Sequence, residues 1–281
     1  MGVDCDPAPL RVWASNVPDA KAVLTTLGPN CTDLELPPPA PDVHVHLSPP
    51  CQAFSRARAN SATQPEVQSS LELLRWSVDL VLSRGDFSWS LEEVPVPAVR
   101  LLLQEYAKLH PAKVAWAVFD CADFGCPQNR QRLIAGPPAM IRKLQESPVE
   151  KRISVREAFE RAGLTTPSAF FKNNTTNRDK TACTRSIEEC AFTVCAGHGL
   201  TWAADREGST VSVMTARQSA VLQGFPLAWK IPSGSRTGQR SVGTSMLDLS
   251  NKSYPCPTHD LPPHSNTHPL LTGNAMSVEL S

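Results

Sequence analysis

The sequence predicts an α/β protein whose first half forms a doubly wound sheet. Between residues 1 and 139, short apolar segments that suit strands alternate with longer segments of helical periodicity. Polar residues suited to chemistry follow several of these strands, and the carboxyl ends of strands in such a sheet line a cleft. The chain of 281 residues is long enough for one large domain, or for one large and one small domain.

The first elements follow from periodicity and turn residues. The N-terminal residues suit the end of a strand, which an acidic turn connects to a helix. The apolar face that we expect for this helix consists of Val17, Ala20, Leu24 and Leu27. After a proline-rich connection, the alternating residues 43–47 predict the next strand. Residues 69–85 form a strongly amphipathic segment that closes on a glycine and predicts a helix.

The next elements complete the alternation. Residues 87–95 predict a short strand that ends in acids and a proline, and residues 97–110 predict a helix. Residues 113–125 predict a strand with a turn, and residues 130–138 predict a strand that stops at Gly-Pro-Pro. These strands and helices favour a mainly parallel sheet.

The second half of the chain has a different texture. Helices are predicted at 153–163 and at 215–224, and short strands with turns are predicted within 191–214. Residues 233–268 are rich in Ser, Pro, Asn and His, which is typical of a loop-rich insertion. We therefore divide the chain into residues 1–139, residues 140–213 and a C-terminal segment of residues 214–281.

Bulk properties narrow the function classes. The formal net charge is zero, so any groove for a polyanion must be local. No run of 18 or more apolar residues predicts a membrane span, and the N-terminus does not resemble a secretion signal. We expect an intracellular protein, in nucleus or cytoplasm or in a host cell if viral, with its nine cysteines as thiols. No metal site is predicted, because the cysteines lack zinc-site spacing. The sequence does not indicate an oligomeric state.

Three polar signals lie where successive predicted strands end: Cys51, Glu92, and Arg130 with Arg132. In a doubly wound sheet the strand ends converge, so a thiol, a carboxylate and two guanidinium groups can meet in one cleft. Cys51 follows a Pro-Pro step that pre-sets the backbone. This set suits covalent catalysis. The alternative for each residue is structural: a buried inert thiol, a surface acid, or a phosphate-facing pair of arginines.

These segments resemble the ordered motifs of the cytosine-C5 methyltransferase family. "SPPCQAFS" is similar to its Pro-Cys-Gln nucleophile loop, and "SLEEVP" is similar to its Glu-Asn-Val segment. "DCADFGCPQNRQRLIAG" is similar to its Gln-x-Arg-x-Arg segment, and "MTARQSAVLQGFP" resembles the helix after its recognition region. "TGNAMS" resembles its final Gly-Asn-Ala segment, and "VDCDPAPLRVWASNVPDA" resembles the strand end and helix that hold the cofactor ribose. Six matches in the family order span almost the whole chain.

The resemblance implies a Rossmann-like methyltransferase sheet that transfers a methyl group from S-adenosylmethionine to C5 of a flipped-out cytosine. Cys51 would add to C6 of the base, Glu92 would bind the N3 and amino edge, and Arg132 would hold O2 with support from Arg130. The residues implied to bind the cofactor are Asp4, Cys5, Asp33, Pro50, Leu71 and Asn274. The residues implied to bind the substrate are Gln52, Ser55 and Gln128.

The resemblance also assigns the three parts of the chain. Residues 1–139 would form the catalytic and cofactor-binding domain, residues 140–213 a small target-recognition region, and residues 214–281 a segment that returns to the catalytic domain. Four cationic residues in the recognition region are candidates for phosphate or base contacts: Lys172, Arg178, Lys180 and Arg185. For each of them a solvated loop is the alternative.

The chain departs from the family pattern at its start. The Phe-x-Gly-x-Gly loop of the first family strand is absent, so the chain is expected to begin near the second strand and to leave a gap in the sheet. Glu93 replaces the family asparagine after the catalytic glutamate. Three functions stay open: a DNA cytosine-C5 methyltransferase, a tRNA cytosine-C5 methyltransferase, and a truncated non-catalytic homologue that binds nucleic acid. The absence of a Cys-Phe-Thr signature favours DNA over tRNA.

Overall fold

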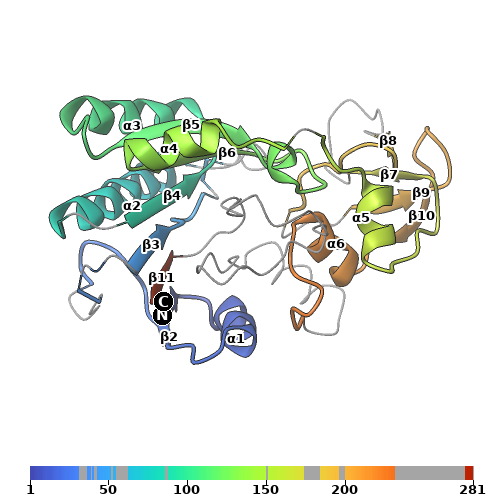
Figure 1. The fold of residues 1–281 in the computed structure, drawn as a ribbon, viewed down its shortest axis with the longest axis horizontal. Coiled ribbons are helices and arrows are strands. Elements are labelled where there is room, and N and C mark those ends of the chain that lie inside the picture. The colour runs from blue at the N-terminus through green and yellow to red at the C-terminus, as the bar shows by residue number, and fades with distance from the viewer. Residues whose placement is uncertain are drawn as a thin grey trace.

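The structure is a computed structural model of the chain. It describes residues 1–31, 37–38, 40, 43–51, 53–54, 63–85, 88–149, 151–173, 184–195 and 200–231, together with the backbone of 276–280. The insertion predicted at 233–268 lies outside the described residues. Figure 1 shows two lobes, the first built around a large sheet and the second around a smaller one.

The first lobe contains a seven-stranded sheet of order β2-β1-β11-β3-β4-β6-β5. Its strands are β1 (Gly2–Asp4), β2 (Ala22–Leu24), β3 (Val43–Leu47), β4 (Ser88–Glu93), β5 (Ala115–Asp120), β6 (Gln131–Gly136) and β11 (Met276–Leu280). Strands β1 to β5 run in one direction, whereas β6 and β11 run antiparallel to their neighbours. The predicted strands β3, β4, β5 and β6 are confirmed.

Strand β11 fills the position at which the sequence predicted a gap. It lies between β1 and β3 and is antiparallel to both, with Ser277 opposite Gly2 and Val278 opposite Val45. Backbone N–H and C=O groups in a sheet interior need partners, and β11 supplies them to both neighbours. The expectation of an open gap is therefore wrong for this structure.

Strand β6 is the second departure from a parallel sheet. A ten-residue connection that contains the 3₁₀ helix η1 (Cys121–Phe124) separates β5 from β6. A connection of this length is too short for a crossover between parallel strands, so β6 folds back antiparallel to β5 and β4. The same turn places the start of β6 at the carboxyl end of β4, since Glu93 is opposite Leu133.

Four helices cover the large sheet: α1 (Pro7–Asn16), α2 (Gln64–Ser83), α3 (Pro97–Leu109) and α4 (Pro138–Gln145). Helix α1 starts where the Asp6 side chain accepts a hydrogen bond from the Ala8 backbone, at 2.9 Å, and it ends before Val17. The predicted helix was displaced toward the C-terminus, because Pro18 ends the helix and Leu24 belongs to β2. Helix α4 was not predicted.

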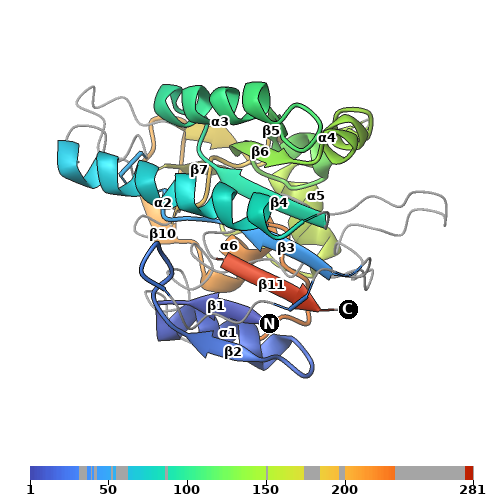
Figure 2. The same cartoon turned by 90° about the vertical axis from the view of Figure 1, so that its left-hand side faces the viewer.

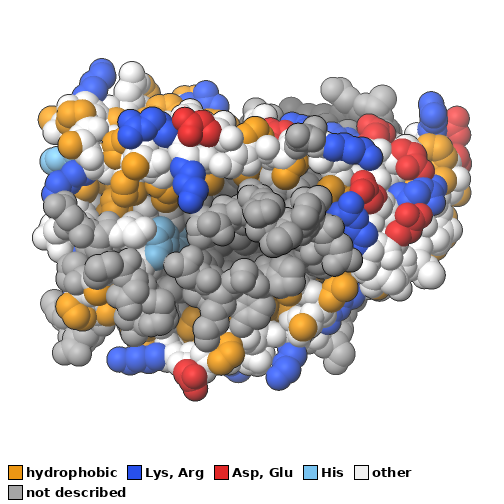
Figure 3. All heavy atoms as spheres, in the orientation of Figure 1, with side chains coloured by type: hydrophobic (Ala, Val, Ile, Leu, Met, Phe, Trp, Pro, Cys, Tyr) orange, Lys and Arg blue, Asp and Glu red, His pale blue; other side chains and the backbone are white. Residues whose placement is uncertain are grey.

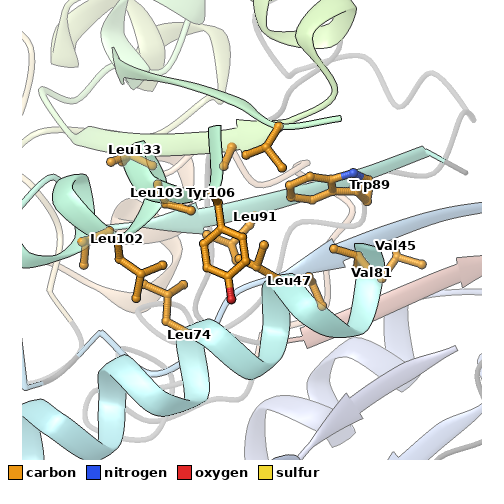
Figure 4. Close-up of a cluster of buried hydrophobic side chains, with 14 of the residues drawn as sticks. Val45, Leu47, Leu74, Val81, Trp89, Leu91, Leu102, Leu103, Tyr106 and Leu133 are labelled. Carbon is orange, nitrogen blue, oxygen red and sulfur yellow. The ribbon is translucent and has the colours of Figure 1, made fainter. Parts of the chain in front are cut away.

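The main core lies between the sheet and helices α2 and α3, which pack side by side on one face (Figure 2). Figure 4 shows the aliphatic and aromatic side chains that fill this layer. Leu47, Leu91 and Leu133 come from three neighbouring strands and are at most 1% exposed. Leu74 and Leu103 meet them from the two helices. Their burial anchors the strand ends that carry the candidate site.

The opposite face of β3 and β4 is polar. His44 Nε2 and His46 Nδ1 both lie 2.8 Å from the hydroxyl of Ser90, and His44 Nδ1 lies 2.7 Å from the hydroxyl of Ser88. Burial lowers the pKa of His46 to about 4, so this imidazole is neutral at physiological pH. The two histidines thus fill one face of the sheet as a hydrogen-bonded ladder.

The second lobe contains a four-stranded sheet of order β10-β9-β7-β8. It comprises β7 (Phe170–Lys172), β8 (Thr184–Ser186), β9 (Thr201–Ala203), β10 (Thr210–Val213), α5 (Val155–Arg161) and α6 (Ala216–Leu222). Its own core includes Phe159, Phe171 and Trp202, with Phe159 and Trp202 in edge contact. Among the described residues no helix is long and apolar enough to cross a membrane.

Candidate active site

Cys51 lies beyond the carboxyl end of β3, after Ser48 and two prolines. Its side chain is buried, and its backbone carbonyl accepts a hydrogen bond from the Phe54 backbone at 3.0 Å, which closes a tight turn. Pro50 is exposed on the same loop. The geometry therefore holds the thiol inside the protein at the end of a strand.

Glu92 lies near the carboxyl end of β4 and is 2% exposed. The Ser48 hydroxyl donates a hydrogen bond to Glu92 Oε2 at 2.9 Å, and Arg132 Nε forms an ion pair with Glu92 Oε1. These contacts follow from the sheet, since β3 and β4 are parallel neighbours and β6 runs back beside β4. The carboxylate is thus held from both sides by neighbouring strands.

Arg130 precedes β6 and is 3% exposed. Its Nη1 donates a hydrogen bond to the Val194 carbonyl of the second lobe at 3.3 Å, and its backbone N–H donates to Asp120 Oδ1 at 2.9 Å. Its Nε is buried and has no hydrogen-bond partner among the described residues. Burial, and then the charge of Arg132, lower the pKa of Arg130.

The four predicted catalytic residues share one electrostatic environment. Cys51 interacts with both Arg130 and Arg132, and Glu92 interacts with the same two guanidinium groups. Burial by itself would lower the pKa of Arg132, but Glu92 and then Cys51 outweigh it, so the net shift is upward. Two buried guanidinium groups against one carboxylate leave an excess of positive charge, which favours an anion in the same cluster.

A second buried thiol lies beside this cluster. Cys121 is fully buried at the start of η1 and interacts with Arg130, Arg132 and Glu92. Burial raises the pKa of Cys121 to about 12 despite the nearby arginines. The Cys121 thiol therefore stays protonated at neutral pH, and of these two cysteines Cys51 is the candidate nucleophile.

Glu93 adds a second carboxyl group at the end of β4. It is 1% exposed, and its Oε2 accepts a hydrogen bond from the Val94 backbone at 2.6 Å. Its Oε1 is buried without a hydrogen-bond partner among the described residues. Burial is the main cause that raises the pKa of Glu93 well above its ordinary value, and the charge of Glu92 adds to it. Glu93 therefore holds its proton to a higher pH than an exposed glutamate does.

Replacing Glu93 by glutamine should stabilise the protein at alkaline pH. The carboxyl is protonated in both states below pH 4.5, and above this pH only the unfolded chain releases the proton easily. Stability of the wild type should thus fall as pH rises from 4.5 toward the raised pKa, by up to about 1.4 kcal/mol per pH unit. Urea unfolding of the wild type and Glu93→Gln at pH values near 4.5 and 8 measures this difference.

The exposed Glu105 on α3 gives the matched control for this substitution. Glu105→Gln removes the same charge at the surface, where its ion pair with Arg75 is worth about 1 kcal/mol at most. Equal stabilisation by both variants at pH 8 would contradict the raised pKa of the buried Glu93 carboxyl.

The described residues that were predicted to bind a cofactor come from three elements of the first lobe: the end of β1, the loop after β3, and α2. Asp4 ends β1 and is half-buried, with Oδ1 accepting the Asp6 backbone N–H at 2.8 Å. Burial is the main cause that raises the pKa of Asp4. Cys5 is exposed beside it, and Leu71 is half-buried in α2. Asp33 and Asn274 lie outside the described residues.

Gln128 is the one predicted substrate-binding residue that the structure describes. It is fully buried, its Oε1 accepts the Val194 backbone N–H at 3.1 Å, and its Nε2 has no hydrogen-bond partner among the described residues. Gln52 and Ser55 lie outside the described residues.

The structure adds one site residue and reassigns two cationic ones. Ser48 contacts Glu92, and its position just before the Pro-Pro step was the only sequence signal for it.

Lys172 donates to the Gly208 carbonyl, and Arg185 Nη1 donates to Asn129 Oδ1, so both head groups make contacts within the protein. Arg178 and Lys180 lie outside the described residues. Figure 3 shows basic and acidic side chains interspersed on the surface of the second lobe.

The chain resembles known proteins in structure rather than in sequence. No family model matches it, and no curated protein matches it. A protein encoded within an Escherichia coli prophage, assigned as a DNA modification methyltransferase, matches at a TM-score of 0.53 and 15% identity over 86% of each chain. S. pombe Dnmt2 methyltransferase matches at a TM-score of 0.46 and 13% identity, over 86% of this chain and 84% of that one. Entamoeba histolytica methyltransferase EhMeth matches at 0.46 and 11% identity, over 87% and 84%.

The likeness to the prophage protein shows the fold. The chain has a Rossmann-like methyltransferase fold, in which a mostly parallel sheet is covered by helices. The fold class predicted from the sequence is confirmed.

Proposed function

We propose that this chain is a DNA cytosine-C5 methyltransferase that uses S-adenosylmethionine. The observation that carries the proposal is Glu92, a buried carboxylate held between Ser48 and Arg132, where Arg132 also interacts with Cys51. An acceptor fixed at the end of a strand, beside a thiol and two guanidinium groups, suits a base whose N3 and amino group need a partner while a nucleophile adds to the ring. The assignment of the prophage protein supports DNA as substrate.

The four residues divide the chemistry among them. Cys51 Sγ bonds to C6 of the cytosine, and the electron pair of the C5–C6 bond moves onto C5, N3 and O2. Glu92 binds the N3 and amino edge and stabilises the ring as N3 gains a proton. Arg132 donates to O2, where negative charge grows, and Arg130 supports it from the same segment. Once C5 carried the methyl group, water would take up the C5 proton, its electron pair would re-form the C5–C6 bond, the Cys51 thiolate would leave C6, and N3 would give up the proton that it had gained. The excess positive charge of the buried cluster favours Cys51 as thiolate during attack.

The described residues fit the cofactor at the end of β1. A half-buried acid at the carboxyl end of a strand is the group that binds ribose hydroxyls in doubly wound nucleotide-binding folds, and Asp4 has this position. Pro50 and Leu71 would line the same side of the site. When bound, S-adenosylmethionine supplies an electrophilic methyl group for C5. We also propose that residues 140–213 form the target-recognition region and that residues 214–281 return to the catalytic domain.

The test is transfer of tritiated methyl groups from S-adenosylmethionine, with duplex DNA and total tRNA in parallel reactions. We expect label in DNA, and digestion of the labelled DNA should yield 5-methylcytosine. Label confined to tRNA would assign the site to the alternative substrate class. Absence of label from both, in a preparation that is folded by circular dichroism, would overturn the proposed enzyme function.

A further inference from the structure

A seam of hydrogen bonds joins the two lobes beside the candidate site. It runs between residues 127–130 of the first lobe and residues 190–194 of the second lobe. The Asn129 backbone N–H donates to the Ala191 carbonyl at 2.8 Å, and the Ala191 N–H donates to the Pro127 carbonyl at 2.8 Å. The Thr193 hydroxyl donates to the Asn129 carbonyl at 2.8 Å. This seam therefore fixes the backbone immediately before Arg130.

Arg185 fastens the seam from within the second lobe. Its Nη1 donates to Asn129 Oδ1 at 2.7 Å and to the Cys190 carbonyl at 2.9 Å. Its guanidinium group also lies over the Phe192 ring, 4.1 Å from the ring centre. One side chain thus binds both sides of the seam, and its planar group matches two acceptors and an aromatic face together.

The seam reaches the guanidinium group of Arg130. Its Nη1 donates to the Val194 carbonyl at 3.3 Å, and the Val194 backbone N–H donates to Gln128 Oε1 at 3.1 Å. Arg130 is 3% exposed, and its Nε is a buried donor that finds no hydrogen-bond partner within the part of the chain that the structure describes. Because Val194 accepts a hydrogen bond from Arg130 Nη1, the orientation of the Arg130 guanidinium group depends on the position of Val194 in the second lobe.

We propose that Arg185 is a positioning residue that acts through Arg130. By fastening residues 190–194 to residues 127–130, it keeps Val194 where it orients the Arg130 guanidinium group. The effect of Arg185 on the reaction rests on the proposed function. That Arg185 holds residues 190–194 to residues 127–130 does not depend on any reaction. It assigns to Arg185 a role in the chemical step, in place of the phosphate contact that its charge suggests.

The two roles of Arg185 predict different kinetics. If Arg185 orients Arg130, replacing it by methionine should slow the chemical step, because small errors in the position of a catalytic group are costly. If Arg185 contacts a phosphate, the same change should weaken DNA binding and reduce the salt dependence of the affinity by about 0.9 in log–log slope. Binding and single-turnover rates measured on one variant therefore separate them.

The experiment compares Arg185→Met with Arg156→Met, which removes an exposed charge that pairs with Glu188 outside the seam. We expect Arg185→Met to lower the single-turnover methyl-transfer rate at least about tenfold. Its DNA dissociation constant should stay within about threefold of the wild type, and Arg156→Met should keep the wild-type rate. A wild-type rate for Arg185→Met, or a loss confined to binding, would overturn the proposal.

A double-mutant cycle tests whether the effect passes through Arg130. In an Arg130→Ala background, Arg185→Met should lower the remaining rate by less than about threefold, because the residue that it positions is gone. A full tenfold loss in that background would show that Arg185 acts by another route. General destabilisation would lower both backgrounds alike, so this readout also excludes a merely structural effect.

Hydrogen exchange tests whether Arg185 holds the two segments of the seam together, and this measurement does not require methyl transfer. Arg185→Met should speed amide exchange at residues 129, 191 and 194, with exchange in β5 and Leu133–Ala135 unchanged. Unchanged exchange at the seam would overturn the proposed fastening even in an active enzyme. If the wild type transfers no methyl group while the seam loosens as expected, the proposed function fails and the fastening stands.

Discussion

Replacing Cys51 by serine will abolish methyl transfer and leave the fold intact. A serine hydroxyl is a far weaker nucleophile than a thiolate, and loss of a covalent nucleophile lowers rates by at least about ten-thousandfold. The change removes little volume from a buried turn, so the thermal unfolding of Cys51→Ser should match that of the wild type. The measurement is tritiated methyl transfer to DNA under single-turnover conditions.

Covalent trapping tests directly whether Cys51 is the nucleophile. With S-adenosylmethionine present, C5 of a 5-fluorocytosine at the target would gain the methyl group but would carry no proton to lose, so the enzyme should remain attached to the duplex through Cys51. Mass spectrometry of the wild-type adduct should place the bond on Cys51, and Cys51→Ser should give no adduct. Cys126→Ser is the matched control, because this half-buried thiol donates a hydrogen bond to the Gln223 carbonyl. Turnover by Cys51→Ser, or an adduct on another residue, would remove Cys51 from its role.

Replacing Arg132 by methionine will damage both stability and rate. The Glu92 side chain, which is 2% exposed, would lose the partner of its buried ion pair. Removing one partner of such a pair lowers the free energy of unfolding by about 3–5 kcal/mol. Loss of the donor at O2 should lower the methyl-transfer rate at least about a hundredfold. Urea unfolding and single-turnover kinetics measure the two effects on the same preparation.

A paired variant separates the two effects of this substitution. Glu92→Gln with Arg132→Met removes both charges, so its unfolding free energy should recover toward the wild type, whereas its rate should fall further. If the double variant were no more stable than Arg132→Met, the ion pair would not be what Arg132 contributes to folding. If Arg132→Met kept the wild-type rate, the O2 contact would have to come from another donor.

The sequence predicted the strands and helices that carry their own signals. Helices α2 and α3 have long apolar periodicity, and β3 to β6 are bounded by proline, glycine or acidic residues. Strand β2 has only three residues, and the pairing of β11 with β1 and β3 depends on residues far away in the chain. Helix α4 was not predicted, because the two prolines after β6 were interpreted as the end of a strand, although proline also suits the first turn of a helix.

The candidate site also contains some residues that the sequence could predict and others that it could not. Glu92 and Arg132 could be predicted because residue type and motif order point to them, and the structure brings the two together. Ser48 could not be predicted as the partner of Glu92, because the contact depends on the register between β3 and β4. Arg185 resembled a phosphate ligand by charge alone, and only the fold shows the carbonyl groups that it binds.

The position of β11 has a consequence for the order in which the protein is built. Strand β11 pairs with β1 and β3, so residues 276–280 are the shared neighbour of two strands that are synthesised early. Until residues 276–280 have left the ribosome, the facing edges of β1 and β3 lack the partner that they have in the finished sheet. Closing contacts over such long chain separations is slow, because the entropy of loop closure opposes it. The centre of this sheet is therefore completed late, only after residues 276–280 and the whole of the second lobe before them have been made.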